Sequence, residues 1–338
     1  MARVSLDDLR KVVQAYVSSG GNAHKAALSM RMPRSTFRDR MNMARMEGLI
    51  LEQEDETLEA SSLEVKKIYL KPTYKIFQRP KYQDVNERIL AIGDSHDGPD
   101  ISSKDRFYAM GRYAAENEVT KIVQIGDFCS MDSMSSHDPN WTIKGQQKPS
   151  FNEDVESFRL ALEAFDAGLG SAVIDKHVTL GNHEDRISRF VNNTPEVSEM
   201  LFEKIYEILD AFGWTYSPYG EFFFIGDVGF THVPLNQMGK PYGGMNSENA
   251  IARDSLHDVV YGHTHKRVDK TFPKIGHDHI TIINLGCSLP EGHIEDYARH
   301  SVTGWSYGVY DLGIQGGKIK EHTWIPMDVL MRDYIDYA

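Results

Sequence analysis

Carboxylate and imidazole side chains recur directly after short apolar runs in the middle of the chain. The run at residues 89–92 is followed by Gly-Asp-Ser-His, which places Asp94 and His96 two residues apart. Four consecutive apolar residues are typical of a strand that is buried on both faces, and loops that follow such strands commonly carry metal ligands. A single Asp-x-His sequence is also typical of an ordinary polar loop. Its interpretation therefore depends on the motifs that follow.

Four later apolar runs end in comparable polar sequences. A helix predicted over residues 103–118, between the first two runs, indicates a parallel crossover. Because the carboxyl ends of parallel strands meet at one sheet edge, we expect these sequences to lie close together. They are Gly-Asp with Asp127, Gly-Asn-His-Glu with Asn182, His183 and Glu184, a single His232, and Gly-His-Thr-His with His263 and His265.

The residue types of this set limit the chemistry that it could perform. Neutral imidazoles, carboxylates and one amide oxygen, without thiolates, favour borderline or hard divalent ions such as Mn²⁺, Fe²⁺ or Zn²⁺. The two cysteines, Cys129 and Cys287, give neither a disulfide framework nor a zinc-type pair. Seven candidate ligands are too many for one such ion.

The ordered set of motifs resembles the calcineurin-like metallophosphoesterases over about residues 88–290. The resemblance implies an α/β fold, a sandwich of two mixed sheets flanked by helices, with the site at the carboxyl ends of the strands. It also implies two metal ions roughly 3.5 to 4 Å apart, which lower the pKa of a shared water and clamp phosphate oxygens. In that family arrangement Asp94, His96 and His265 hold the first ion, Asn182, His232 and His263 hold the second, and Asp127 bridges them.

The same resemblance places His183 against the phosphate, where it would stabilise or protonate the leaving oxygen. Glu184 would orient the ring of His183. The second motif departs from the family pattern. Where the family usually has a second aspartate, three residues after the bridging one, this chain has Ser130, and Asp132 follows two residues later. We therefore expect the support of the metal ligands to differ from that of the family.

A glycine-rich loop at residues 233–246 directly follows the proposed ligand His232. It carries Lys240 and Tyr242, which could contact a phosphate or a base. A flexible linker is an equally plausible interpretation of the same composition.

Basic residues concentrate at the start of the chain. Residues 1–50 hold nine Lys or Arg against four Asp or Glu, which leaves 28 basic against 45 acidic residues in the rest of a chain of net charge −12. Local positive charge on an acidic protein predicts a polyanionic partner for this part, although a solvated basic helix face is the alternative. Residues 52–64 hold six acidic residues and no basic one, which is typical of a solvated linker.

Three short helices are predicted within the basic part. The turn between the second and the third resembles the helix-turn-helix of small DNA-binding domains, with Arg31 where glycine is usual. This resemblance implies that the third helix contacts DNA phosphates or base edges, and docking to a protein is the alternative. The helices are expected at residues 6–17, 22–30 and 36–46, the third capped by Ser35. The residues expected to contact DNA are Arg34, Ser35, Thr36, Arg38 and Arg40.

The 338 residues, 41% hydrophobic and 25% charged, have the composition of a soluble globular protein. No apolar run approaches the length of a membrane span, and the charged start is unlike a signal peptide. Both features favour a cytoplasmic protein. We expect a small all-α helix-turn-helix domain at residues 1–50, an acidic linker and connecting arm at residues 51–87, and a metallophosphoesterase domain at residues 88–338.

The preferred function is hydrolysis of phosphodiester bonds in nucleic acid by two divalent metal ions. The N-terminal module would target DNA, since a tethered binding module raises the local concentration of substrate. The acidic catalytic domain lacks the broad basic groove expected of a nuclease. One alternative is therefore a phosphodiesterase or phosphatase for small nucleotides or phosphoproteins, with the module as a docking unit. Another is a DNA-binding or docking protein with a structural metal site. The modular organisation also resembles phage-encoded hydrolases.

Overall fold

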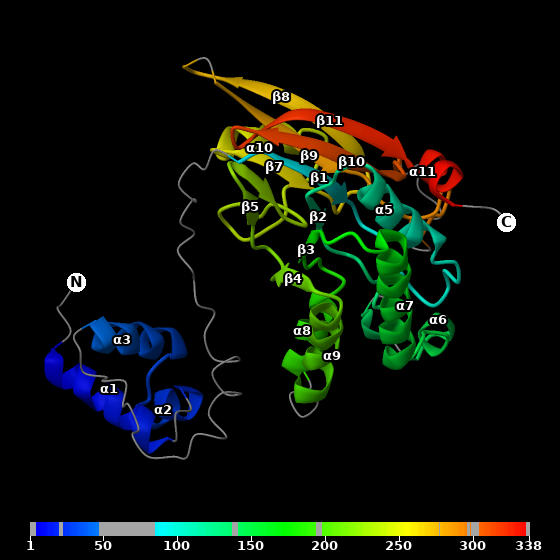
Figure 1. Ribbon diagram of the computed structural model, residues 1–338. Coiled ribbons are helices and arrows are strands. Elements are labelled where there is room, and N and C mark those ends of the chain that lie inside the picture. Colours follow the sequence, from blue (N-terminus) through cyan, green and yellow to red (C-terminus); the bar gives the residue numbers. More distant parts are fainter. Residues whose placement is uncertain are drawn as a thin grey trace. The chain divides into compact units, whose positions relative to one another are not determined.

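The computed structural model describes residues 5–19, 23–46, 85–136, 141–193, 198–276, 278–295, 298 and 304–335. The backbone separates into two compact units, Met1–Phe77 and Gln78–Ala338. Most of the predicted linker and connecting arm, residues 51–84, lies outside the described residues. Figure 1 shows the order of the elements along the chain.

Three helices form the described part of the first unit. Val12, Ala26 and Phe37, one from each helix, pack into its small apolar core. Arg31, between the second and third helices, has a φ of 49°. That is the left-handed conformation that glycine adopts most readily, so the arginine takes the backbone shape that a glycine would provide in this turn. The helices are α1 (Leu6–Ser18), α2 (Ala23–Ser29) and α3 (Arg34–Met46).

Helix α3 begins two residues earlier than predicted. Because it starts at Arg34, Ser35 lies within its first turn and is not the capping residue. The amide of Phe37 donates to the carbonyl of Pro33 (2.9 Å), so the helical hydrogen bonding extends back to the proline. That α3 contacts DNA stays a prediction.

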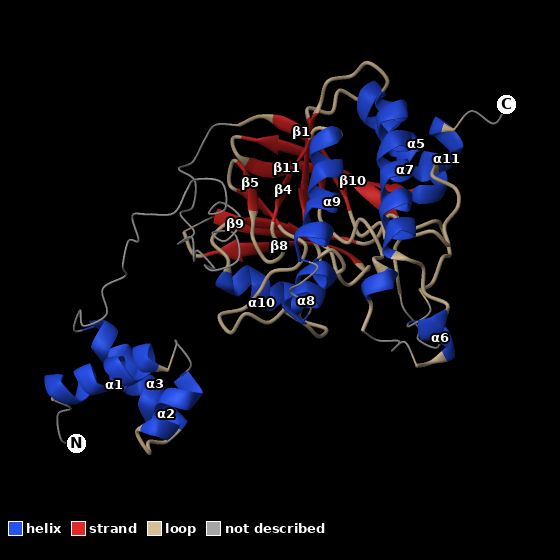
Figure 2. Cartoon of the chain, turned by 90° about the horizontal axis from the view of Figure 1, so that it is seen from below, coloured by secondary structure: helices blue, strands red, loops and turns tan. Residues whose placement is uncertain are grey.

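Two mixed β-sheets form the centre of the second unit, which confirms the predicted sheet sandwich (Figure 2). In order across the first sheet, the strands are β11 (Lys318–Pro326), β10 (Gly308–Gln315), β1 (Glu87–Ile92), β2 (Lys121–Gln124), β3 (Asp175–Thr179) and β4 (Trp214–Ser217). In order across the second sheet, they are β5 (Phe223–Ile225), β6 (Val228–Phe230), β7 (Asp258–Tyr261), β9 (Asp278–Leu285) and β8 (Arg267–Lys274).

Parallel pairing brings the carboxyl ends of the inner strands together. Strands β1 to β4 are parallel, as are β6, β7 and β9. A bridge between Asp94, after β1, and Cys287, after β9, joins the ends of the two sheets. The loops that follow these parallel strands therefore meet at one edge of the sandwich.

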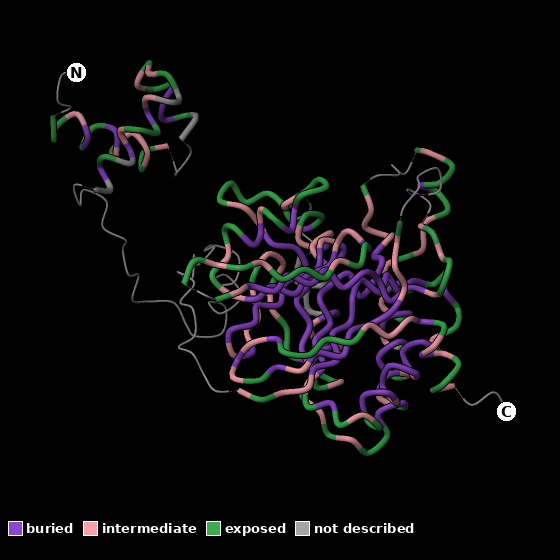
Figure 3. The backbone as a smooth tube through the Cα atoms, turned by 90° about the horizontal axis from the view of Figure 1, so that it is seen from above, coloured by how far each residue is buried: buried purple, intermediate pink, exposed green. Residues whose placement is uncertain are grey.

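Apolar packing on both faces of β1 explains its continuous apolar sequence. Ile89 and Ala91 pack between the two sheets, whereas Leu90 and Ile92 pack against helices on the outer face of the first sheet. The buried backbone accordingly runs through the centre of this unit (Figure 3). The helices that contribute to the outer cluster are α5 (Asp105–Glu116), α7 (Phe151–Leu169), α8 (Asp185–Asn193), α9 (Ser198–Ala211) and α11 (Met327–Tyr334).

On the other side, α10 (Ser247–Asp254) packs Ile251 and Ala252 against the outer face of the second sheet. A capping box opens α7, where the side chains of Ser150 and Glu153 each accept a hydrogen bond from the other's backbone amide. Two short helical turns, η1 (Asp132–Met134) and α6 (Ile143–Gln146), precede it. Within the described ranges, no helix has the length and apolar character needed to cross a bilayer.

Candidate metal centre

Every candidate ligand lies in a loop at the edge where the parallel strands end. The elements that position them are short buried strands, so their first loop residues are fixed by the sheets. Asp94 and His96 follow β1, Asp127 follows β2, Asn182 and His183 follow β3, His232 follows β6, and His263 and His265 follow β7.

Asp94, His96 and His265 converge on one point. The Nε2 atoms of His96 and His265 lie 2.9 Å apart, and Nε2 of His265 lies 3.1 Å from Oδ2 of Asp94. All three side chains are buried. Their ligand atoms lie within 4.8 Å of one another, close enough to share one metal ion.

Asp127, His232 and His263 form a second group of this kind. Nε2 of His232 lies 3.3 Å from Oδ2 of Asp127 and 3.2 Å from Nδ1 of His263. The amide oxygen Oδ1 of Asn182 is 2.9 Å from the same Nε2 atom. Oδ2 of Asp127 also lies 3.7 Å from Nε2 of His96, which belongs to the first group. The Asp127 carboxylate thus stands between the two groups, where a bridging ligand would be.

The donor atoms of both groups fit divalent metal ions. Neither carboxylate oxygen of Asp94 receives a hydrogen bond within the described part of the chain, although both are buried. A buried carboxylate without a donor is costly unless a cation neutralises it. Imidazole, carboxylate and amide oxygen ligands without thiolates suit Mn²⁺, Fe²⁺ and Zn²⁺.

Backbone strain concentrates at the same edge. His96, Asp127, His263 and His265 have φ values of 40°, 47°, 70° and 57°. Four of the seven non-glycine residues with positive φ in the described ranges are therefore candidate ligands. Residues held in this region cost on the order of 1–3 kcal/mol each and cluster at functional sites.

Two glycines make room for the carboxylates. A Cβ atom on Gly181 would lie 2.1 Å from Oδ1 of Asp127, and one on Gly262 would lie 2.6 Å from Oδ1 of Asp94. Neither contact is possible between real atoms. The glycine that ends each of these strands is thus needed for the position of a ligand from another strand.

Burial and neighbouring charge set the protonation of the histidines. Burial lowers the pKa of His96 well below its ordinary value, and the neighbouring His183 and His265 lower it further. Burial also lowers the pKa of His232, but the carboxylates of Asp127 and Asp94 outweigh it and raise that pKa to about 9. The negative charge that favours a proton on His232 would equally favour a metal cation in its place.

The ring of His183 is fixed from two sides. Its Nδ1 donates to the backbone carbonyl of Ser130 (2.7 Å). Its Nε2 lies 3.9 Å from Oδ2 of Asp127 and accepts from Nη2 of Arg186 (3.2 Å). Arg186 is itself paired with Asp132 (3.0 Å). Burial lowers the pKa of His183; the Asp127 carboxylate opposes this effect and the Arg186 guanidinium adds to it.

Glu184 does not orient the ring of His183, and this prediction is wrong. Its carboxylate accepts from the backbone amides of Asp127 (3.0 Å), Cys129 (3.0 Å) and Gly181 (2.8 Å). Burial and the nearby Asp127 carboxylate raise the pKa of Glu184 to about 7, while the amide donors act in the opposite direction. Glu184 therefore joins the loop after β2 to the loop after β3. The physical reason is that three backbone amides of the two loops donate to its carboxylate, so the carboxylate is not available to the ring of His183.

Sequence reasoning missed two charged residues that support the site. Arg186 donates to His183. The sequence could have indicated this contact, because Arg186 comes three residues after His183 and side chains at that spacing are neighbours on a helix. Asp97 is buried and bonds to Lys104 (2.8 Å) and Arg106 (2.9 Å), which anchors the loop after β1. The sequence offers no comparable signal for Asp97, because one partner, Arg106, lies in the next helix and the other, Lys104, directly precedes that helix.

The loop at residues 233–246 does not bring Lys240 or Tyr242 to the cleft, where they could contact a phosphate or a base. The hydroxyl of Tyr242 donates to Asp254 (2.8 Å), and Lys240 is exposed to solvent. Neither residue lines the cleft described below.

The residues expected to contact DNA all lie in the first half of α3. Arg38 is exposed, and Thr36 and Arg40 are partly exposed, while Phe37 and Met41 face the core of the unit. The side chains of Arg34 and Ser35 lie outside the described part of the structure.

A cleft of about 770 Å³ opens over both ligand groups. His96, Asp127 and Asn182 lie on its metal side, and residues of α8, among them Arg186 and Phe190, line a wall. This cleft gives a substrate direct access to the candidate metal centre.

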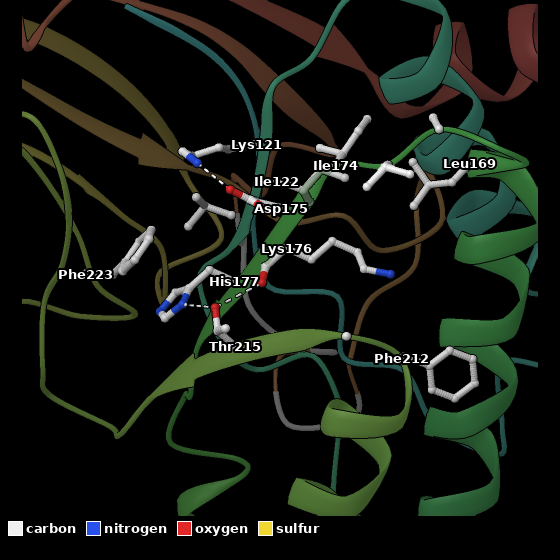
Figure 4. A pocket seen from close by; sticks show the side chains of 14 residues that line it. Lys121, Ile122, Leu169, Ile174, Asp175, Lys176, His177, Phe212, Thr215 and Phe223 are labelled. Atoms are coloured by element: carbon white, nitrogen blue, oxygen red, sulfur yellow. Dashed lines mark hydrogen bonds and ion pairs between the residues drawn. The ribbon is translucent and has the colours of Figure 1, made fainter. Parts of the chain in front are cut away.

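A second cavity, of about 560 Å³, lies at the opposite ends of β2 and β3 (Figure 4). There Lys121 pairs with Asp175 (2.6 Å), and Nδ1 of His177 lies 2.8 Å from the hydroxyl of Thr215. None of the metal-ligating groups found in the described ranges lies there. The candidate site is therefore the cleft at the carboxyl ends of the strands.

A family model matches more than half of the chain. Residues 87–267 match the family described as Calcineurin-like phosphoesterase. Among solved structures, the chain is similar to Yfce, a phosphoesterase from E. coli (16% identity, 70% of this chain and 98% of that chain, TM-score 0.31). It is also similar to Vps29 complexed with Zn²⁺ from Entamoeba histolytica (14% identity, 71% and 99%, TM-score 0.29). A comparison with curated proteins found no match.

Proposed function

The chain belongs to the calcineurin-like phosphoesterases, metal-dependent hydrolases of phosphoester bonds, and we propose that it hydrolyses phosphodiester bonds in nucleic acid. The observation that carries the proposal is the convergence of seven donor side chains beneath one open cleft, with His183 beside them. A structural metal site would need neither the cleft nor His183.

In this proposal the two groups of donors hold one divalent ion each. Asp94, His96 and His265 hold the first, while His232, His263 and Asn182 hold the second. When bound, such a pair of ions lowers the pKa of a water molecule and neutralises charge on the phosphate. Asp127 lies between the groups, and the amide of His183 donates to its Oδ1 (2.8 Å), which fixes the orientation of the carboxylate.

His183 acts on the substrate itself. Its Nε2 faces the cleft beside Asp127, and the bond from Nδ1 to the Ser130 carbonyl holds the ring in that direction. A ring held in this way can donate a proton from Nε2 to the leaving oxygen after it has gained one from solvent. The guanidinium of Arg186, whose Nη2 donates to Nε2, is oriented so that a phosphate oxygen entering beside His183 is within its reach.

Two features favour nucleic acid as the source of the phosphodiester. The cleft is lined by Arg186 and Arg189, although the unit that contains it is acidic overall. Residues 1–50 are basic and include α3, whose Arg38 is exposed. A basic module tethered to a hydrolase raises the local concentration of a polyanionic substrate.

A small nucleotide is the second candidate substrate. Acidic residues exceed basic ones by 45 to 28 after residue 50, and the cleft of about 770 Å³ is of the size that holds a small ligand. In this version the N-terminal module is a docking unit.

Cleavage of end-labelled single- and double-stranded DNA by Mn²⁺-loaded protein tests the proposal. The control is Asp127→Asn, since asparagine tolerates positive φ. We expect the unmodified protein to cleave DNA and Asp127→Asn to have lost this activity. If the protein hydrolyses methyl p-nitrophenyl phosphate but does not cleave DNA, small nucleotides would replace nucleic acid as the proposed substrate. Absence of hydrolysis of every phosphodiester would overturn the proposal.

A further inference from the structure

We propose that the face of α8 that lines the cleft is a binding subsite for the nucleoside next to the scissile phosphate, with Phe190 stacking on its base. The inference rests on the proposed function and adds to it the part of the substrate that is recognised. It applies equally to a nucleic acid and to a small nucleotide, because both carry a base beside the phosphate.

Helix α8 has two chemically different faces. Ile187 and Val191 belong to the large apolar cluster that packs against the first sheet. Arg186, Arg189 and Phe190 line the cleft. Residues three and four positions apart share one face of a helix, so these three side chains form a continuous wall that leads away from the metal centre.

Arg186 marks the phosphate end of this wall. Its Nη2 lies 3.2 Å from Nε2 of His183, and its side chain is only 12% exposed. Arg186 is held in place by the carbonyl of Ser130 (2.7 Å) and the carboxylate of Asp132 (3.0 Å). A phosphate that contacts His183 is therefore within reach of a guanidinium that is already oriented.

Arg189 continues the positive charge along the wall. Its Nη2 donates to the carbonyl of Asn182 (2.6 Å), and its Nε lies 3.4 Å from Asp185. More than half of its side chain stays exposed, at 57%. The charge of Arg189 is thus available to a further phosphate on the same substrate.

Phe190 lies one turn beyond Arg186, about 6 Å along the helix axis. Phe190 is 39% exposed and lines a cleft whose other lining residues are polar except for Met134. Within the described residues, Phe190 belongs to none of the packed apolar clusters that include its neighbours Ile187 and Val191. The fold therefore places an exposed aromatic side chain beside the cleft, one helical turn from Arg186.

A nucleotide has the chemistry that this wall would recognise. Its phosphate is an anion for Arg186, its sugar spans the distance of about one helical turn, and its base presents a flat π surface to Phe190. Stacking of a base on an aromatic side chain is tolerant of sequence and strengthens binding substantially. A simple alkyl phosphodiester would engage only the arginine end of the wall.

Isothermal titration of Mn²⁺-loaded protein with thymidine 5′-monophosphate, and separately with inorganic phosphate, tests this subsite without requiring turnover. The quantity of interest is the preference for the nucleotide over phosphate. We expect the unmodified protein to prefer the nucleotide by about tenfold, as stacking predicts. Phe190→Leu should abolish the preference and Phe190→Tyr should keep it.

The pair of variants separates stacking from packing. Leucine keeps an apolar side chain of similar size but has no π face, so a packing role would survive Phe190→Leu. Leu256→Ala, at an exposed residue before the start of β7, is the matched control and should leave the preference as it is. A preference that persists in Phe190→Leu, or that is absent from the unmodified protein, would overturn the subsite. Hydrolysis of methyl p-nitrophenyl phosphate by the unmodified protein reports separately on the proposed function.

Discussion

At the scale of single residues, the candidate centre depends on close approach between loops of different strands. Asp127 is contacted from three directions, since the amide of His183 donates to its side chain, Glu184 accepts from its backbone amide, and Gly181 lies against both. The carboxylate is therefore placed by the neighbouring loop as much as by its own strand. Disturbing that loop should affect metal binding even where no ligand is removed.

Gly181→Ala is the direct test of this dependence. The new methyl group would lie 2.1 Å from Oδ1 and 2.3 Å from the amide nitrogen of Asp127, so the loop must shift. We expect a loss of Mn²⁺ affinity of about 10- to 100-fold, the range for changes that reorient a ligand. Calorimetric titration with Mn²⁺ measures it. Gly243→Ala is the control because nothing lies within 4 Å of a Cβ atom there. Equal Mn²⁺ affinity in the two variants would contradict the argument.

His183→Asn separates the proposed catalytic role from metal binding. His183 lies within reach of His96 and Asp127 and could also ligate a metal ion. If it acts on the substrate instead, turnover of methyl p-nitrophenyl phosphate should fall by about 10²- to 10⁴-fold, with the bound Mn²⁺ unchanged. Metal analysis of the purified variant decides the matter. A matching loss of bound metal would make His183 a ligand.

At the scale of elements, the strands that carry chemistry were predictable and the strands that frame them were not. Strands β1, β2, β3 and β7 are short, contain buried apolar residues and are followed within two residues by glycine, so the sequence indicates both that they are strands and where they end. Strands β8, β10 and β11 were not predicted. They take part in the antiparallel pairs that widen both sheets, and β8 has no buried residue that would mark an apolar face. Local sequence carries little information on such pairing, which is decided by packing.

The same distinction applies to the site. The candidate ligands follow predicted strand ends, so parallel pairing was sufficient to bring them together. The contacts of Glu184 could not be predicted in this way, because its partners are backbone amides that become unpaired only when two loops fold. Asp97 was missed for a similar reason, since its cationic partners approach from α5 and the segment before it.

His177, on β3, should make the stability of the fold depend on pH. Its ring stacks on Phe223 of β5 and lies within hydrogen-bond distance of Thr215 and Ser217 of β4. Burial lowers the pKa of His177 from 6.5 to about 4. The unfolded chain therefore binds more protons between these values, so the contribution of the neutral ring is present above pH 6.5 and is lost as the pH falls toward 4.

The expected loss between pH 7.5 and pH 5 is about 2 kcal/mol of unfolding free energy. Urea unfolding with EDTA present measures it without a contribution from metal release. His177→Gln keeps a hydrogen-bonding side chain but cannot titrate, so its unfolding free energy should fall less over the same interval. If both proteins lose the same free energy, His177 is not the group responsible.

At the scale of the whole molecule, charge is divided unevenly along the chain, between two parts with different proposed tasks. The first 50 residues carry a net charge of +5 and the remainder −17, from nine basic and four acidic residues against 28 and 45. A polyanion should be attracted by the first part and repelled by most of the surface of the second. The proposed targeting of DNA would then depend on the first unit, and hydrolysis of a small diester would not.

Arg38→Ala tests that division in the full-length protein. Arg38 is exposed on α3, so its removal should leave the core of Val12, Ala26 and Phe37 intact. If Arg38 contacts a phosphate, DNA binding should weaken for every sequence, and the slope of log affinity against log salt should fall by about one. Hydrolysis of methyl p-nitrophenyl phosphate should stay as it is, because a small diester with a single charge offers no polyanion for a basic module to bind. An unchanged salt slope, measured by fluorescence anisotropy with a labelled duplex, would favour docking to a protein as the role of this helix.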